Sequence, residues 1–140
     1  MIPVTQTKVV VFNSQGAAVQ RGNCYAACIA SILELPITEV PNIETLYAMD
    51  GTFYYEVLCK WLAHLGYEMT TDGRFGCFHG DRTKDCFIEE LQNQYYIVSG
   101  KSPRGIQHAC IYKNGKMIHD PHPTREGLVT EEHFESITVI

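Results

Sequence analysis

Cys24 is the residue whose type and position best suit covalent chemistry. It follows Gly22-Asn23 and opens the apolar run CYAACIASIL. A cysteine at the start of a helix lies beside unpaired backbone N–H groups and the positive end of the helix dipole, which favour a thiolate. The Cys24 N–H can also face an oxyanion formed when that thiolate attacks a carbonyl. Although a cysteine chosen at random is more often a small core residue, this position predicts a nucleophile.

A nucleophile of this kind needs a base that is distant in sequence and close in space. His64, His79 and His133 lie in polar stretches, so we expect them to be solvated. His108 differs, because it begins an apolar run that is typical of a strand, and Asp120 follows twelve residues later. We therefore predict that His108 is the general base for Cys24.

The turn after this strand decides which residue orients His108. If Asn114-Gly115 is a two-residue turn, His119 shares the face of His108 and Asp120 points away. If residues 113–115 form a three-residue loop, His108 lies opposite Asp120 instead. We predict the second register, because a carboxylate stabilises the imidazolium formed during attack whereas a second histidine opposes it.

Helices that could position these residues follow from the hydrophobic pattern. Residues 24–33 are apolar almost all round, which predicts a helix buried on most of its surface. Residues 52–65 have an amphipathic pattern ending at Gly66, a C-terminal cap, and residues 85–93 predict a shorter helix. The predicted apolar face of the second helix consists of Tyr54, Val57, Leu58, Trp61, Leu62 and Leu65.

Strands dominate the last third of the chain. The strand-like runs there are 94–100, 108–112, 116–119 and 137–140, with an earlier strand at 67–71. Residues 9–20 predict a short strand, a turn and a return segment. Helices followed by an antiparallel sheet are typical of a segregated α+β fold. At 140 residues, the chain is expected to form a single domain, 1–140.

Two blocks of sequence resemble papain-like cysteine peptidases: GNCYAACIASILELP and, much later, QHACIYKNGKMIHDP. The similarity is closest to bacteriocin-processing cysteine peptidases and related small phage-encoded proteins. It implies a papain-like α+β fold in which a central helix starting at Cys24 packs on a C-terminal antiparallel sheet. It also implies a catalytic triad of Cys24, His108 and Asp120 that transfers an acyl group without a cofactor.

The same resemblance implies an oxyanion-hole glutamine before the nucleophile, and two residues are candidates. Gln20 lies four residues before Cys24. Gln6 can serve instead if residues 8–19 form an inserted hairpin, and we slightly favour Gln6. Such a glutamine would donate a hydrogen bond to the oxyanion.

A zinc site is the competing interpretation of the cysteine and histidine content. The possible ligands are Cys77, His79, Cys86, His119 and His122. The sequence contains no Cys-x-x-Cys pair, so we predict no metal site. The six cysteines are expected to be free thiols, with Cys28 a core residue one helical turn after Cys24.

Charge and hydropathy limit the kinds of molecule that the protein is expected to bind. A net charge of -5 with scattered Lys and Arg residues argues against nucleic acid. The first apolar run is too short for a signal peptide or a membrane span, so we expect a cytoplasmic protein, in the host cytoplasm if phage-encoded. We expect a cysteine hydrolase acting on a peptide, a protein or a small amide or ester. The alternative is a catalytically silent papain-like module that binds a protein or small ligand, and the oligomeric state is not predicted.

Overall fold

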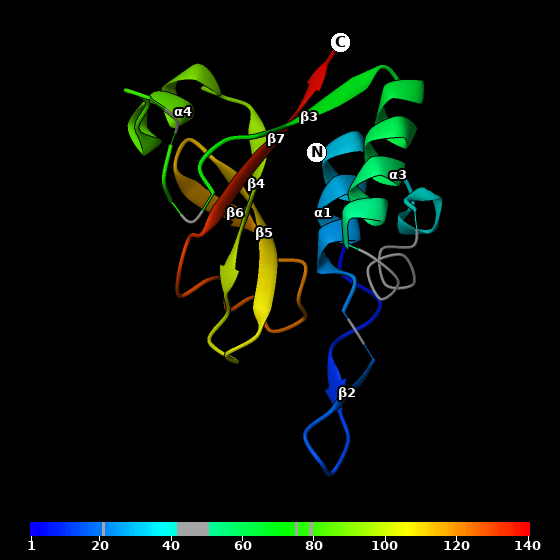
Figure 1. Ribbon diagram of the computed structural model, residues 1–140. Helices are drawn as coiled ribbons and strands as arrows, with labels where there is room; N and C mark the ends of the chain where they lie inside the picture. The colour runs from blue at the N-terminus through cyan, green and yellow to red at the C-terminus, as the bar shows by residue number, and fades with distance from the viewer. Residues whose placement is uncertain (21, 42–50, 75, 79) are drawn as a thin grey trace.

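The computed structural model describes residues 1–20, 22–41, 51–74, 76–78 and 80–140 (Figure 1). Three α-helices, one 3-10 helix and seven strands are described, which confirms the α+β class. Their order is β1 (Val11–Phe12), β2 (Ala18–Gln20), α1 (Cys24–Leu33), η1 (Ile37–Glu39), α3 (Gly51–His64), β3 (Tyr67–Thr71), α4 (Lys84–Glu90), β4 (Tyr95–Lys101), β5 (Gln107–Lys113), β6 (Lys116–His119) and β7 (His133–Val139). None of the described helices has the length and apolar character needed to cross a membrane.

Helix α1 begins at Cys24 and ends at Leu33, as the sequence predicts. Residues 26–31 are all buried, so the helix is enclosed on most of its surface. The helix stops at Glu34, which adopts a left-handed conformation with φ 58°, and Leu35 then donates its N–H to the Ala30 carbonyl. Because α1 begins at Cys24 and its middle is buried, the position of Cys24 in the fold is fixed.

Five antiparallel strands form the main sheet in the order β3-β7-β4-β5-β6. Two apolar clusters use alternate residues of its strands, since Ile97 and Val98 on β4 belong to different clusters. One cluster joins α1 and α3 to the sheet, and the other joins α4 to it through Phe87. Figure 1 shows α1 and α3 on one side of the sheet and α4 on the other. Helices therefore cover both faces of the sheet, and β5 lies against α1.

Strands β1 and β2 form a separate hairpin that projects away from the rest of the molecule (Figure 1). The predicted strand, turn and return segment are thus confirmed. Asn13 holds the turn, because its side-chain oxygen accepts hydrogen bonds from the N–H groups of Gln15 and Ala17. Phe12 is 53% exposed on this arm.

Three predicted elements have different limits in the structure. The second helix begins at Gly51 and ends at His64, and Leu65 beyond it is 43% exposed, so its predicted place on the apolar face is wrong. The last strand begins at His133, earlier than predicted, because alternation extends the buried pattern backwards. The short helix occupies Lys84–Glu90. The side chain of Tyr54, and all of His79, lie outside the described residues.

Candidate active site

Cys24 is the first residue of α1 and is half-buried. Asn23 precedes it as the N-cap, but no side chain caps the helix. The Asn23 side-chain oxygen instead accepts hydrogen bonds from the backbone N–H groups of Thr7 and Lys8, each at 3.0 Å. The first turn also carries no acidic residue. The positive end of the helix dipole is therefore left for the thiol or for an anion formed beside it.

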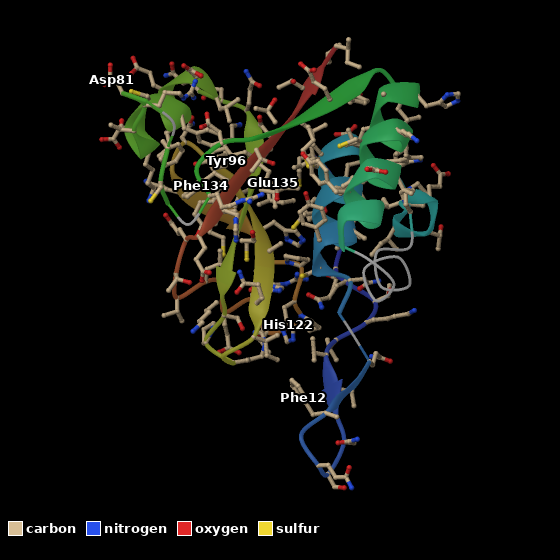
Figure 2. All side chains as sticks on the ribbon, viewed as in Figure 1. Phe12, Asp81, Tyr96, His122, Phe134 and Glu135 are labelled. Atoms are coloured by element: carbon tan, nitrogen blue, oxygen red, sulfur yellow. The ribbon has the colours of Figure 1, made fainter. Side chains whose placement is uncertain are left out.

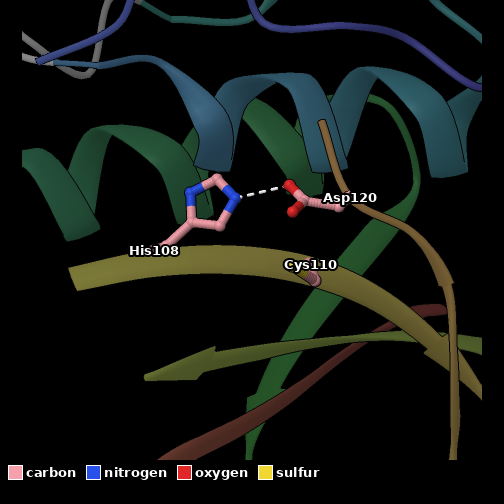
Figure 3. Close-up of side chains that lie close together, drawn as sticks. All are labelled: His108, Cys110 and Asp120. Carbon is pink, nitrogen blue, oxygen red and sulfur yellow. Dashed lines mark hydrogen bonds and ion pairs between the residues drawn. The ribbon is translucent and has the colours of Figure 1, made fainter. Parts of the chain in front are cut away.

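His108 and Asp120 form a buried pair next to this helix. The Nε2 atom of His108 lies 2.6 Å from Oδ1 of Asp120, and the exposed fractions of the two residues are 4% and 1%. Figure 3 shows the imidazole between β5 and the helices, with one ring nitrogen facing Asp120 and the other turned away. Because Nε2 is held by the carboxylate, Nδ1 is the nitrogen left for a proton transfer.

Asp120 is fixed by several donors besides His108. Its Oδ1 accepts the N–H of His122 at 2.8 Å, and its Oδ2 accepts the N–H of Gly127 at 2.7 Å. The Arg125 guanidinium donates to the Asp120 backbone carbonyl. Gly127 has φ 77°, a left-handed conformation that favours glycine and turns its N–H toward the carboxylate. These contacts hold the carboxylate in one orientation toward His108.

The electrostatics of the pair favour the charged forms of both residues. Burial lowers the pKa of His108, but the hydrogen bond to Asp120 and contacts with Cys110 and Cys24 outweigh it and raise the pKa to about 11. Burial raises the pKa of Asp120, but His108 and the two backbone N–H groups outweigh it and hold the pKa well below its usual range. At neutral pH the site therefore holds an imidazolium and a carboxylate.

The turn between β5 and β6 does not have the predicted three-residue loop. Asn114 and Gly115 both have positive φ, 52° and 80°, which is the type I′ pattern of a two-residue hairpin turn. Tyr112 accordingly pairs with Met117, whereas the predicted register required Lys116. The predicted register is wrong because Asn-Gly adopts the tighter turn that matches the twist of the strands.

A β-bulge beyond this turn nevertheless brings Asp120 to His108. The register shifts between Ile111 and Tyr112, so that Ile111 pairs with His119. A shift of one residue exchanges the faces of a strand, so Asp120 follows on the face that alternation assigns to His108. His119, the rival orienting residue, instead places Nε2 2.8 Å from the Val4 carbonyl oxygen. The bulge therefore accounts for the pairing without the predicted loop.

A pocket of about 120 Å³ joins the predicted nucleophile and base. Its walls are Gln6, Val9, Val10, Gly22, Cys24, Arg104, Ile106, His108 and His122. Gln6 is thus in the same pocket as Cys24, whereas the Gln20 side chain lies on the exposed arm and donates to the Val9 carbonyl. The structure brings together four of the five sequence-predicted site residues, with Asp120 behind His108.

Backbone hydrogen bonds of Gln6 and of the two residues after it hold the N-terminal segment against the site. The Gln6 N–H donates to the Pro121 carbonyl at 2.9 Å, and Asn23 binds the next two residues as described above. The side-chain Nε2 donates to the Lys8 carbonyl at 2.7 Å, while the buried Oε1 has no hydrogen-bond partner among the described residues. The segment between Gln6 and Cys24 loops out as the β1–β2 hairpin, which is the condition under which the sequence favoured Gln6.

Sequence reasoning missed Cys110, which is fully buried beside the pair. One atom each from His108, Cys110 and Asp120 lies within 4.8 Å of the others, a spacing that could also hold a metal ion. The direct hydrogen bond accounts for the proximity of His108 and Asp120. Cys110 lies two positions after His108 on β5, and the period of two was the signal that could have found it.

The candidate zinc ligands do not converge in the part of the chain that the structure describes. Cys77 and Cys86 are exposed, His119 is bound to the N-terminal segment, and His122 lines the pocket. His79 lies outside the described residues. All six cysteines are free thiols, as predicted.

Comparisons with protein-family models, with curated proteins and with solved structures found no match to this chain.

Proposed function

We propose that this protein is a cysteine hydrolase of papain-like architecture that acts by acyl transfer. The supporting observation is that Cys24 and His108 line one pocket while Asp120 is hydrogen-bonded to Nε2 of the His108 imidazole. Nucleophile, base and orienting residue in that order form the arrangement that activates a thiol for attack on a carbonyl.

The chemistry follows from these positions. The Cys24 thiolate attacks the carbonyl carbon of an amide or ester, so that a carbon–sulfur bond forms and the carbonyl oxygen becomes an oxyanion. His108 gives its Nδ1 proton to the departing amine or alcohol as the bond to that group breaks. Water then loses a proton to His108, attacks the thioester and releases the acid and Cys24.

The raised pKa of His108 suits the first half of this cycle. An imidazolium is present at neutral pH, so the proton needed by the leaving group is already on the ring. Asp120 stabilises that cation and remains ionised, because its own pKa is lowered. The carboxylate thus acts through His108 and need not accept a proton itself.

Gln6 and the Cys24 backbone N–H are the proposed oxyanion donors. One hydrogen of the Gln6 amide group is bound to the Lys8 carbonyl, which leaves the second hydrogen for a ligand. Cys24 is the first residue of α1, so its N–H has no acceptor within the helix and can serve the same purpose. This assignment favours Gln6 over Gln20.

A catalytically silent binding module draws support from one observation, the unpaired Oε1 of Gln6. A buried oxygen without a donor is costly, and a bound ligand that offers an N–H group would satisfy it. The pocket of about 120 Å³ is smaller than the usual small-molecule site. Such a module would bind ligand without turning it over.

An acylation experiment separates the two functions. We expect 4-nitrophenyl acetate to release a burst of nitrophenol and to leave one acetyl group, which intact-mass and peptide mapping place on Cys24. Cys24→Ala should abolish the burst, while Cys59→Ala, which changes a half-buried cysteine of α3, should retain it. A folded protein that shows no acylation at Cys24 would exclude the hydrolase and favour the silent module.

A further inference from the structure

Arg104 and His122 line the same pocket as Cys24, yet the proposed acyl transfer uses neither. Thr124 connects them, because its hydroxyl accepts from Arg104 Nη1 at 3.1 Å and lies 2.9 Å from His122 Nδ1. Figure 2 shows His122 near the lower end of the sheet, on the side of the β1–β2 arm. The two side chains therefore form a connected rim on the pocket.

The hydrogen bonds of His122 fix its tautomer. The Thr124 backbone N–H donates to Nδ1 at 3.1 Å, so Nδ1 is an acceptor and carries no proton. Burial lowers the pKa of His122, and the Arg104 and His108 cations lower it further, which keeps the ring neutral. The single ring proton is then on Nε2, for which the described residues provide no hydrogen-bond partner. His122 consequently offers one neutral N–H donor.

Arg104 offers charge as well as donors. Among the described residues, the Glu126 carboxylate forms an ion pair with Arg104 at 3.8 Å, and its side chain is 45% exposed, so the contact is long and solvated. The Arg104 side chain is 24% exposed, and its guanidinium donates to Thr124 through one nitrogen, Nη1. The described residues provide no hydrogen-bond partner for its other N–H groups, which can form the two parallel hydrogen bonds that suit a carboxylate.

The rim stands next to the reacting groups. The ring centroid of His122 lies 5.9 Å from that of His108, edge to face, and the backbone N–H of His122 donates to Asp120 Oδ1. A group bound by the rim would therefore lie within a few bonds of the carbon attacked by Cys24. The rim offers the remaining N–H groups of Arg104 and the Nε2–H of His122 as donors, and an ionised carboxylate only accepts hydrogen bonds.

We propose that Arg104 and His122 bind a carboxylate of the substrate, so that the enzyme prefers acids whose carboxylate lies a few bonds from the reacting carbon. This inference rests on the proposed function, because it assumes that the substrate reacts at Cys24. It names the substrate class of that site, which the triad alone leaves open.

Alkylation by iodoacetate and by iodoacetamide tests the proposal without a known substrate. In both reactions the Cys24 thiolate attacks the CH2 carbon, the carbon–sulfur bond forms, and iodide leaves. The two reagents differ only in that iodoacetate carries a carboxylate where iodoacetamide carries a neutral amide. We expect the ratio of the iodoacetate rate to the iodoacetamide rate at Cys24 to fall about tenfold in Arg104→Gln.

Matched variants isolate the rim from the general charge of the site. Lys60→Gln removes one exposed cation on α3, away from the pocket, and should leave the ratio unchanged. His122→Phe should lower the ratio, and His122→Gln, which keeps an N–H donor, should restore part of it. An equal ratio in wild type and Arg104→Gln overturns the carboxylate site. Failure of Cys24 to react with either reagent overturns the proposed function instead.

The carboxylate can belong to the acyl part or to the leaving part of the substrate, and two pairs of esters distinguish these. A preference for mono-4-nitrophenyl succinate over 4-nitrophenyl butyrate places it in the acyl part, as for an acidic side chain. A preference for 4-acetoxybenzoate over phenyl acetate places it in the leaving part, as for a C-terminal residue. Either preference, lost in Arg104→Gln, supports the proposal, and no preference in either pair contradicts it.

Discussion

The two sides of the pocket differ in how firmly their polar groups are held. On the Asp120 side, both carboxylate oxygens and the backbone carbonyl accept hydrogen bonds. On the Gln6 side, the side-chain amide makes one hydrogen bond to the residues that the structure describes, and its buried oxygen makes none with them. Groups with several partners have one favoured orientation, whereas a partly satisfied amide can rotate at little cost.

This difference indicates a division of tasks. The His108–Asp120 pair must be oriented before substrate arrives, because proton transfer depends on its geometry. The Gln6 donor is needed only when the oxyanion forms, so it can complete its hydrogen bonds at that stage. Changes on the Asp120 side should therefore affect activity more than changes on the Gln6 side.

The largest effect is expected from Asp120→Asn. The amide retains the shape of the carboxylate but loses the charge that stabilises the His108 imidazolium, so ester turnover should fall about 10³-fold or more. The control is His119→Gln, which keeps a donor for the Val4 carbonyl and should leave most activity. Steady-state hydrolysis of a nitrophenyl ester, with circular dichroism to confirm folding, measures both. Greater damage from His119→Gln in folded protein would show that the orienting residue is misassigned.

A smaller loss is expected from Gln6→Ala. Removal of one oxyanion donor should lower kcat by about 10²-fold with little change in KM, because the bond forms in the transition state. Gln20→Ala is the matched control, since Gln20 lies on the arm and should have no effect. If the two variants have equal kcat values, neither the Gln6 assignment nor the division of tasks holds.

The ion pair should also make stability depend on pH. Because the pKa of His108 is raised, its contribution is complete below the unfolded value of about 6.5 and is lost as pH rises toward about 11. Because the pKa of Asp120 is lowered, its contribution is present above about 3.9 and is lost as pH falls.

Thermal unfolding of wild type and Asp120→Asn measures this contribution. The Tm advantage of the wild type should be largest between about pH 4 and 6.5 and should shrink steadily toward about pH 9.5. Groups that titrate alike in both proteins cancel in the difference. A Tm difference that stays constant over that range would show that the pair is not charged in the folded protein.

Metal removal is expected to have no effect on stability or activity. Hydrogen bonds already satisfy His108 and Asp120, so a strong chelator should leave Tm and ester turnover unchanged. A sharper test adds zinc to the chelator-treated protein and measures Tm, which should again be unchanged. Release of stoichiometric zinc with loss of structure would instead assign the His108, Cys110 and Asp120 group to a metal.

Local sequence patterns predicted the parts of the site that local physics controls. The start of α1 at Cys24 was predicted from Gly22-Asn23 followed by a run that is apolar almost all round, and β5 from a strand-like run beginning at His108. The bulge before His119 could not be predicted, because it depends on how β6 meets its neighbours. The approach of Arg104 to the pocket is likewise a tertiary contact without a local signal.

The most direct test of the central claim is the relative alkylation rate of the cysteines at neutral pH. Burial raises the pKa of Cys28 and Cys110, so both should react slowly. Cys86 is the stringent comparison, because it is exposed and hydrogen bonds from Thr83 lower its pKa.

Limiting iodoacetamide followed by peptide mass spectrometry gives these rates in one experiment. We predict that Cys24 is labelled faster than Cys28, Cys59, Cys86 and Cys110, and that His108→Ala slows Cys24 while Cys86 is unchanged. Labelling of Cys24 that is equal to or slower than that of Cys86, and indifferent to His108→Ala, would contradict a Cys24–His108 nucleophile.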